Sequence, residues 1–433
     1  MPFYHPAIIE TLNRIHNSTY TIVPLNELLD LLTDGTHHTP TYCDNGVKFI
    51  SVTNVCENNI DFVNTKYIST KEHCELVKRC FPQHGDILLT KIGSIGRAAI
   101  VPENAPEFSL FVSVALLRAK ENIDSRYLCA YLNTSIVQKQ FKRHLKGIGV
   151  PDLHLENIAN TQVILPDEPI RNSLTKLYFE ALEFSRKMIA DADAILASFE
   201  DSIVEQFELQ NADEKKLCFA VKYAQIDGVI DVKRYYVPKS TSTLLSVSDV
   251  CDIVENKVNV SNYGNNIIDW IRIDDLPNQP LDIEEIRTQP ANEVEGSFFE
   301  VKENDILVAR LGPTILNQKI VMVRSLQRTT IASSEFLVLR CKDGYNPEAV
   351  MAVLKTDYYK DLMYSHSRGS TPSRYRLNRE DMLKLPFPDI KEFQEELSTE
   401  ANCVREKVKN MRIQAETDWQ VAKEQFEKEL LGE

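Results

Sequence analysis

The two stretches FPQHGDILLTKIG at 81–93 and FEVKENDILVARLG at 299–312 decide the fold. The tripeptide Asp-Ile-Leu begins at Asp86 in the first stretch and at Asp305 in the second, an offset of 219. A repeat unit of this length is far longer than that of a solenoid or a propeller. The sequence therefore predicts a duplicated domain. Further pairs of blocks follow the same order, at offsets between 219 and 224: 49–55 with 270–276, 130–136 with 352–358, and 152–158 with 376–382.

Each repeat mixes two kinds of pattern. Short runs rich in β-branched residues, such as FISV from Phe49 and WIRI from Trp270, are typical of strands. A helix-like stretch follows late in each repeat, at 125–141 and at 346–363. We therefore expect two repeated α+β domains.

A different pattern follows the Pro-Asp that closes each repeat. Apolar residues recur every three or four positions from Ile170 to Phe207 and again from Phe393 to Leu430. Such spacing over about 38 residues predicts two long amphipathic or coiled-coil helices, each spanning roughly 57 Å. Because a helix with a full apolar stripe is unstable alone in water, we expect the two to pair, most simply antiparallel. The residues expected to contact the other helix or a partner are Leu177, Phe184, Met188, Ile195, Val404, Val408, Met411 and Trp419.

The expected domain organisation follows from these patterns. Two globular domains alternate with two long helices, and a link joins the first helix to the second domain. The expected boundaries are an N-terminal segment at 1–19, the first domain at 20–166, the first helix at 167–209, the link at 210–240, the second domain at 241–388 and the second helix at 389–433.

Charge and hydropathy narrow the class of protein. The formal net charge of −14 is unusual for a nucleic-acid-binding chain, but the two helical segments carry about −6 and −5 of it. No apolar run approaches the roughly 18–20 residues of a membrane span, and the N-terminus lacks the layout of a signal peptide. The nine cysteines form no Cys-x-x-Cys pair, which favours scattered reduced thiols. We expect a cytoplasmic protein.

Basic side chains gather around glycines at equivalent places in the two repeats. Backbone N–H groups and cationic side chains can both reach a phosphate from such a loop. The alternative is a solvated helix end followed by a turn, and the recurrence in register weighs against it. The candidates are Lys142, Arg143 and Lys146 in the first repeat, and Arg368, Ser370, Arg374 and Arg376 in the second.

The segment TDGTHHTP at 33–40 is similar to a phrase found in target recognition domains of type I restriction-modification specificity (S) subunits. FISVTNV at 49–55, GDIL at 85–88 and KIGSIG at 91–96 continue the resemblance. It extends over the chain from about residue 20, including the duplication and both helices. The second repeat departs from it, because 256–262 reads NKVNVSN where the first has the His-His phrase.

This resemblance implies a non-catalytic subunit that reads a bipartite, asymmetric site in double-stranded DNA. The helices would fix the spacer between the half-sites and dock two methyltransferase subunits, and restriction subunits would join the complex. S-adenosylmethionine, ATP and magnesium are expected on those partners and no cofactor on this chain. Besides the basic clusters, we expect DNA contacts from Thr36, His37, His38, Lys91, Ser94, Arg97 and Arg310.

The sequence offers little support for a metal site or a catalytic centre. Adjacent histidines such as His37 and His38 point to opposite sides of an extended segment and lack a further ligand at metal spacing, so we expect no metal site. The glycines at 93–96 do not form a P-loop, and no catalytic grouping stands out. The alternative to a DNA-recognition subunit is a helical scaffold that binds proteins without reading DNA.

Overall fold

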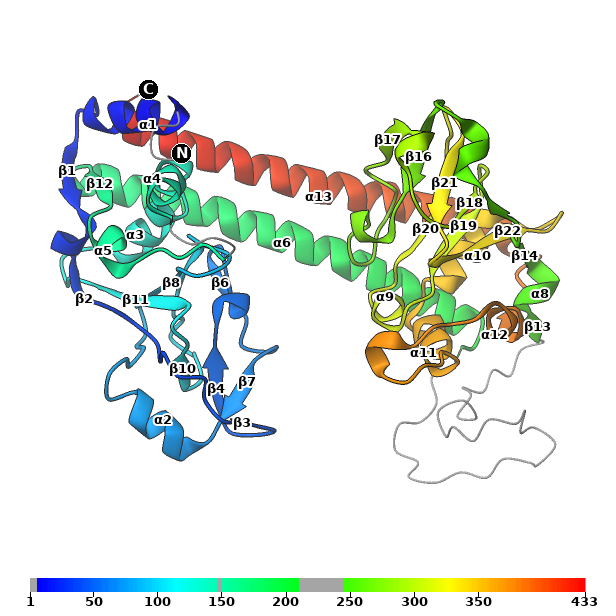
Figure 1. The fold of residues 1–433 in the computed structure, drawn as a ribbon, viewed down its shortest axis with the longest axis horizontal. Coiled ribbons are helices and arrows are strands. Elements are labelled where there is room, and N and C mark those ends of the chain that lie inside the picture. The colour runs from blue at the N-terminus through cyan, green and yellow to red at the C-terminus, as the bar shows by residue number, and fades with distance from the viewer. Residues whose placement is uncertain (1–5, 146–149, 210–243, 433) are drawn as a thin grey trace. The chain divides into compact units, whose positions relative to one another are not determined.

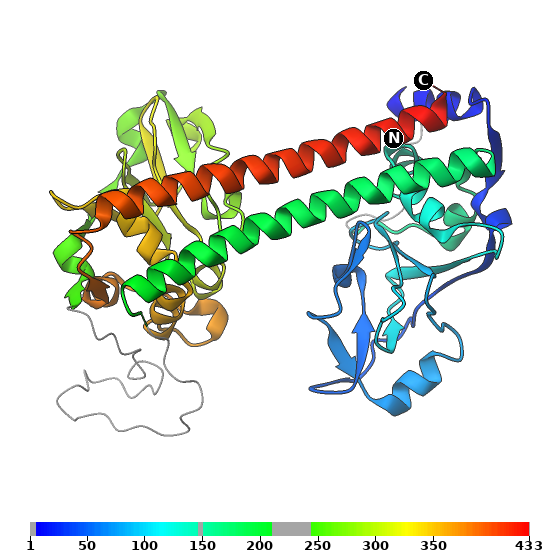
Figure 2. The same cartoon turned by 180° about the vertical axis from the view of Figure 1, so that it is seen from behind.

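The computed structural model describes residues 6–145, 150–209 and 244–432, and it divides into two compact units. Unit 1 comprises Met1–Lys187 with Gln414–Glu433, and unit 2 comprises Met188–Ile413. Figure 1 labels the helices and strands, and Figure 2 shows the same elements from behind. The expected link at 210–240 lies outside the described residues, and the expected boundaries remain predictions.

Unit 1 is built on a four-stranded sheet of order β2-β11-β8-β9 and a second sheet of order β10-β4-β7-β3. Two further strand pairs, β1 with β12 and β5 with β6, complete it. Its elements are α1 (Pro6–His16), β1 (Thr21–Pro24), β2 (Leu29–Asp34), β3 (Tyr42–Cys43), β4 (Val47–Ile50), β5 (Val55–Cys56), β6 (Asn59–Ile60), β7 (Lys66–Ile68), α2 (Thr70–Leu76), β8 (Ile87–Thr90), β9 (Ala98–Ile100), β10 (Phe108–Leu110), β11 (Val114–Ala119), α3 (Ser125–Leu132), α4 (Ser135–His144), α5 (Leu155–Ala159) and β12 (Gln162–Leu165), with short 3₁₀ turns at Leu25–Leu28 and Val52–Asn54.

Unit 2 repeats this plan with the corresponding sheet order β14-β22-β19-β20. Its second sheet has five strands, β15-β18-β21-β16-β17, and β13 pairs with β23. Its elements are β13 (Leu244–Ser246), α8 (Val247–Val250), β14 (Cys251–Ile253), β15 (Lys257–Val258), β16 (Ile267–Ile271), β17 (Arg287–Pro290), β18 (Phe298–Glu300), β19 (Ile306–Ala309), α9 (Gly312–Leu316), β20 (Ile320–Met322), β21 (Thr330–Ser333), β22 (Phe336–Cys341), α10 (Pro347–Leu354), α11 (Asp357–Ser365), α12 (Arg379–Lys384) and β23 (Pro386–Pro388), with 3₁₀ turns at Val260–Tyr263, Ile273–Asp275, Ala291–Glu293 and Pro372–Arg374.

The duplicated Asp-Ile-Leu block forms the central strand of each unit. All four residues of β8 and of β19 are buried, because the strand packs on both of its faces. Side chains alternate between the faces of a strand, so Ile87 joins one hydrophobic cluster and Leu88 the other. Ile306 and Leu307 divide in the same way. The predicted duplication is therefore present in the cores of both units.

A buried carboxylate precedes each central strand and pairs with an arginine of the neighbouring strand. Asp86 accepts two hydrogen bonds from Arg118, both at 2.8 Å. Asp305 accepts two from Arg340, at 2.8 and 2.7 Å. The hydrogen bond to Asp86 raises the pKa of Arg118, and the hydrogen bond to Asp305 raises that of Arg340. An equivalent bidentate Arg–Asp pair thus links the start of the central strand to its neighbouring strand in each unit.

The helix-like stretches at 125–141 and 346–363 are each broken into two helices, α3 with α4 and α10 with α11. The breaks fall at equivalent threonines. The Thr134 hydroxyl donates to the Tyr131 carbonyl at 2.6 Å, and the Thr356 hydroxyl donates to Val353 at 2.9 Å. Each hydroxyl donates a hydrogen bond to a backbone carbonyl in the last turn of the first helix. The first helix therefore ends there, and the chain turns before the second helix begins.

The two long helices, α6 (Glu168–Gln206, 39 residues) and α13 (Gln394–Leu431, 38 residues), confirm the predicted pair. Figures 1 and 2 draw them in green and red. In unit 1 the first half of α6 packs on the second half of α13, where the Tyr178 ring lies 4.8 Å from that of Trp419. In unit 2 the second half of α6 packs on the first half of α13, with Phe207 near Phe393. Ala192 of α6 also packs with Val408 of α13, so the packed parts run antiparallel in unit 2. Among the described helices, none is both long and apolar enough to cross a membrane.

Candidate nucleic-acid interface

The candidate residues of unit 1 lie where the central strand β8 ends. The Lys91 N–H donates to the Ser113 carbonyl at 2.9 Å, and the Lys91 carbonyl accepts the Leu153 N–H at 2.9 Å. Two residues further on, the Gly93 N–H donates to the Pro151 carbonyl at 3.1 Å. The loop after β8 is thus held by the segment that follows the basic cluster of α4.

Unit 2 repeats these three backbone hydrogen bonds after β19. The Arg310 N–H donates to the Glu335 carbonyl at 3.1 Å, the Arg310 carbonyl accepts the Leu377 N–H at 2.9 Å, and the Gly312 N–H donates to Tyr375 at 2.7 Å. A side chain at Gly312 would come within 2.8 Å of a backbone oxygen, so glycine permits this close approach. Both units therefore position a cation, Lys91 or Arg310, on the same framework.

Asp34, the last residue of β2, organises the cluster in unit 1. Its carboxylate accepts a hydrogen bond from Arg79 at 2.6 Å and lies 3.2 Å from the His37 ring nitrogen Nε2. Lys91 Nζ lies 3.5 Å from the same carboxylate and 3.7 Å from that of Asp152. One buried anion thus faces three basic side chains.

The burial of Lys91 differs from the expectation of an open DNA contact. Only 5% of Lys91 is exposed, and its ammonium faces two carboxylates that compensate the cost of burial. Lys91 therefore positions the cluster, whereas His37 and Arg79 present more than half of their side chains to solvent. No sequence pattern pointed to Arg79, a single arginine 45 positions from the carboxylate that it contacts.

The 33–40 segment is shaped by close backbone contacts. A side chain at Gly35 would meet the Leu110 carbonyl oxygen at 2.0 Å, so only glycine fits there. Thr36 forms a parallel bridge to Phe111, and its hydroxyl accepts the His38 N–H at 3.2 Å. Both His37 and His38 are exposed on this segment. Imidazole and hydroxyl groups presented in this way can hydrogen-bond to DNA.

The loop after β8 and helix α4 meet through one side chain. The Gln138 amide donates to the Gly96 carbonyl at 2.8 Å, and a side chain at Gly96 would clash with Gln138. Ser94 and Arg97 are exposed on this loop. On α4, Lys142 is exposed and Arg143 is half-buried. Lys146 lies outside the described residues.

In unit 2 the basic segment forms a closed hairpin-like loop. Arg368 and Arg376 exchange two backbone hydrogen bonds, at 3.0 and 2.8 Å. The Arg368 guanidinium is anchored to Asp381 at 3.0 Å, and that of Arg376 to Glu335 at 2.8 Å. Between these anchors, Ser370 and Arg374 project into solvent. Arg374 makes no ion pair with a described residue, so its charge is available to an anion.

The two units differ in what faces the central cation. By strand register the position equivalent to Asp34 in unit 2 is Glu255, and its carboxylate pairs with Arg379 rather than with the central cation. Within the described part of the chain, the buried Nε of Arg310 has no hydrogen-bond partner. Arg310 is partly exposed, whereas Lys91 is buried between carboxylates. The charged groups around the central cation therefore differ between the two units.

The residues expected to pair the long helices fall into two groups. Val408 and Trp419 are buried, and Met188, Ile195, Val404 and Met411 are partly buried. Leu177 and Phe184 are instead 39% and 54% exposed. The apolar stripe of α6 is wider than the part of its surface that is buried. Leu174, Tyr178 and Leu182 pack into the core of unit 1, whereas the neighbouring apolar positions Leu177 and Phe184 stay exposed. Of the two roles expected for Leu177 and Phe184, only partner binding fits their exposure.

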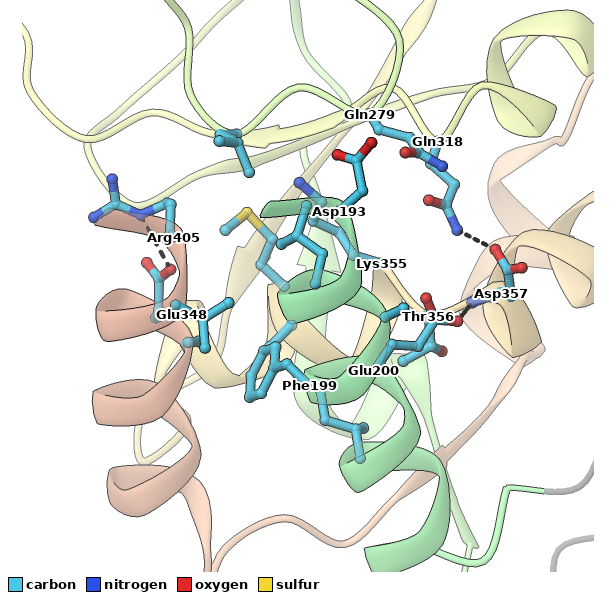
Figure 3. Close-up of a pocket in the computed structure, with 18 residues that line it drawn as sticks. Asp193, Phe199, Glu200, Gln279, Gln318, Glu348, Lys355, Thr356, Asp357 and Arg405 are labelled. Carbon is cyan, nitrogen blue, oxygen red and sulfur yellow. Dashed lines mark hydrogen bonds and ion pairs between the residues drawn. The ribbon is translucent and has the colours of Figure 1, made fainter. Parts of the chain in front are cut away.

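A cavity of about 300 Å³ in unit 2 is a second place where a ligand could bind (Figure 3). Its acidic groups, however, already have partners. Glu348 pairs with Arg324 at 2.6 Å, and Asp357 accepts a hydrogen bond from the Gln318 amide at 2.7 Å. Within the described ranges, no group of three or more His, Cys, Asp or Glu residues could hold a metal ion. The cavity walls form an internal ion-pair network.

Lys355 in this cavity gives a pH-dependent prediction. Burial lowers its pKa from 10.5 to about 8, while its Nζ donates to the Pro280 carbonyl at 2.5 Å. Between about pH 8 and 10.5, Lys355 is therefore protonated in the unfolded chain and largely neutral in the folded chain. Below pH 8 it is charged in both states, and the full cost of burying that charge lowers the stability of the folded chain. Lys355→Met should stabilise unit 2 at pH 7 by on the order of 1–2 kcal/mol, allowing for the hydrogen bond that it removes. Urea denaturation across this range should show the gain shrinking as pH rises. Lys407→Met, on the exposed side of α13, is the control, and an equal gain at all pH values would contradict the prediction.

These observations define a class of protein. Each unit is an α+β domain that takes part of both long helices into its core. Beside the end of its central strand, unit 1 presents His37, His38 and Arg79, whereas unit 2 presents Ser370 and Arg374. Exposed cationic and hydrogen-bonding groups on a rigid framework are what DNA phosphates and base edges require. The structure is that of a duplicated α+β protein in which both units present exposed cationic and hydrogen-bonding groups beside the central strand.

One protein-family model matches most of the first unit. Residues 17–178 match the family model described as the type I restriction modification DNA specificity domain. The resemblance stated from the sequence is therefore confirmed over these residues. No curated protein matches the chain.

Several solved structures resemble the chain over nearly its whole length. One, described under "Structural basis underlying complex assembly and conformational transition of the type I R-M system", is 15% identical, covers 95% of this chain and 97% of its own, and has a TM-score of 0.47. The type I restriction-modification S subunit from M. genitalium is 10% identical, with 96% of each chain covered and a TM-score of 0.45. The HsdS subunit from Thermoanaerobacter tengcongensis is 13% identical, with 95% and 97% covered and a TM-score of 0.33.

Proposed function

We propose that this chain is the sequence-specific DNA-binding subunit of a type I restriction-modification complex and that each unit reads one half of a bipartite, asymmetric site. The observation that carries the proposal is the framework repeated after β8 and β19, with three equivalent backbone hydrogen bonds in each unit. Because each unit carries one cation-bearing loop on an equivalent framework, each unit can bind one half-site. Because the cations and their surroundings differ between the units, the half-sites should differ in sequence.

The long helices supply the second part of the proposal. They fix the spacer between the half-sites and dock two methyltransferase subunits, to which restriction subunits would be added. S-adenosylmethionine, ATP and magnesium would bind to those subunits, and we assign no reaction step to this chain. Ile170, Leu177 and Phe184 support docking, since they recur every seven residues along α6 and are all exposed. A seven-residue apolar spacing on an exposed helix suits packing against partner helices.

Selection from random double-stranded DNA by the complex reconstituted with its methyltransferase subunits tests the proposal. We expect enrichment of two specified blocks separated by an unspecified spacer of fixed length. The reconstituted complex is needed because the net charge of −14 opposes binding by the chain alone. If no sequence is enriched while the complex assembles normally, the chain is a protein-binding scaffold instead.

Docking on α6 gives a second prediction. Leu177→Asp with Phe184→Asp should leave the folded chain intact, because both side chains are exposed, but should weaken methyltransferase binding by about 100-fold or more through two charges in an apolar contact. Size-exclusion chromatography and calorimetry measure the two effects. The control is Asn172→Asp, which adds a charge at an exposed polar position of the same helix. Unchanged assembly of the double variant would exclude this face as the docking surface.

A further inference from the structure

Two cysteines face each other across neighbouring strands of unit 2. Cys251 of β14 is paired in register with Cys341 of β22, and their Sγ atoms are 3.6 Å apart. Hydrogen bonds flank them on both sides: the Lys342 N–H donates to Val250, and the Val254 N–H donates to Val338. Opposite residues in an antiparallel ladder alternate between hydrogen-bonded and non-hydrogen-bonded pairs. Because the pairs 250/342 and 254/338 are hydrogen-bonded, Cys251 and Cys341 form a non-hydrogen-bonded pair.

This arrangement allows a disulfide bond between Cys251 and Cys341 with little movement of the backbone. Cα atoms of a non-hydrogen-bonded pair are about 4.5 Å apart, which lies inside the range of about 4.4–6.8 Å that disulfides span. Cys341 is partly exposed, whereas Cys251 is buried. The remaining described cysteines are free thiols as well, and none of them lies in contact with another thiol.

The duplication shows that the fold does not require thiols here. In unit 1 the equivalent pair, 222 residues earlier, is Leu29 of β2 opposite Ala119 of β11. Two apolar side chains therefore fill the equivalent position in unit 1, and no thiol is needed there for packing. The cysteine pair is an addition specific to unit 2.

We propose that Cys251 and Cys341 are a redox modification site that forms a reversible disulfide when unit 2 meets a peroxide. The Cys341 thiol reduces the peroxide, becomes a sulfenic acid and releases one water molecule. The Cys251 sulfur then attacks the Cys341 sulfur, so that the S–S bond forms and the S–O bond of the sulfenic acid breaks. The departing hydroxide takes the Cys251 proton and leaves as a second water molecule. Two thiols are oxidised for each peroxide reduced, and a small dithiol reverses the reaction by exchange.

The order of these steps follows from the surroundings of the two thiols. The hydrogen bond to Cys341, together with burial, raises the pKa of Cys251. Cys251 therefore stays protonated at neutral pH, and the oxidant meets Cys341, the more exposed of the two. β14 is an edge strand of only three residues. A disulfide would fasten it to β22, and we expect the oxidised chain to melt about 5 °C higher than the reduced chain.

The test is peroxide oxidation of the reduced, full-length chain followed by alkylation and peptide mass spectrometry. The expected product is a linked peptide pair that contains Cys251 and Cys341, lacks two hydrogen atoms and is restored by dithiothreitol. Cys341→Ser should abolish it. The variant Cys251→Leu with Cys341→Ala copies the pair of unit 1, so it should fold normally and lose both the link and the change in Tm.

Two outcomes would overturn the proposal. One is a folded chain whose Cys341 is overoxidised or remains alkylatable while no linked pair forms. The other is a pair that forms equally in urea, which would show that the native register is irrelevant. Neither result depends on DNA, so the redox site and the DNA-reading function can fail separately.

Discussion

Val408→Asp is expected to lower the free energy of unfolding by about 3–5 kcal/mol. Val408 is fully buried on α13, where it packs with Ala192 of α6 and with Leu281. A carboxylate placed there either remains charged without a partner or must take up a proton, and both cost stability. Urea denaturation of the full chain, followed by circular dichroism, measures the loss.

Ile413→Asp is the matched control for this variant. Ile413 lies on the same helix and is 55% exposed, so the same new charge should change stability by less than about 0.5 kcal/mol. Equal stability of the two variants would contradict the packing of α6 on α13 in unit 2.

Arg374→Ala with Arg376→Ala is expected to weaken binding of the reconstituted complex to its DNA by about 10- to 100-fold at physiological salt. Both side chains are exposed on the loop closed by Arg368 and Arg376, and Arg374 makes no ion pair with a described residue. If they contact phosphates, affinity should fall for all sequences. The slope of log K against log salt should then decrease by roughly 0.9 for each phosphate that the variant no longer neutralises.

A charge-matched control separates a direct phosphate contact from an effect of overall charge. Lys391→Ala with Lys407→Ala removes two exposed cations of unit 2 outside this loop and should change affinity by less than about threefold. A weakening confined to one base of one half-site would assign the arginines to base readout. Equal effects of both double variants would remove the loop from the interface.

The duplicated order of blocks was sufficient to predict the architecture. Asp86 and Asp305 precede buried strands at equivalent positions, and the sheet orders around those strands match. Both long helices were predictable because neither contains an interior glycine or proline and the apolar spacing continues throughout. The breaks before α4 and α11 were missed, since the apolar spacing runs on past Thr134 and Thr356 and the hydroxyl contacts that end the helices are local.

The site was less predictable because its electrostatics depend on contacts between distant segments. Lys91 looked like a surface cation, and only the folded chain brings Asp34 and Asp152 to it. Periodicity alone also did not distinguish Leu177 and Phe184 from buried neighbours such as Tyr178. A stripe wider than one contact face contains residues that the chain itself leaves uncovered.

Methylome sequencing of the host with and without this chain tests the central claim most directly. We predict that removing the chain abolishes adenine methylation at one motif made of two different specified halves separated by a fixed unspecified spacer. An unchanged methylome, or the loss of a single continuous motif, would contradict the proposal that two units read two half-sites.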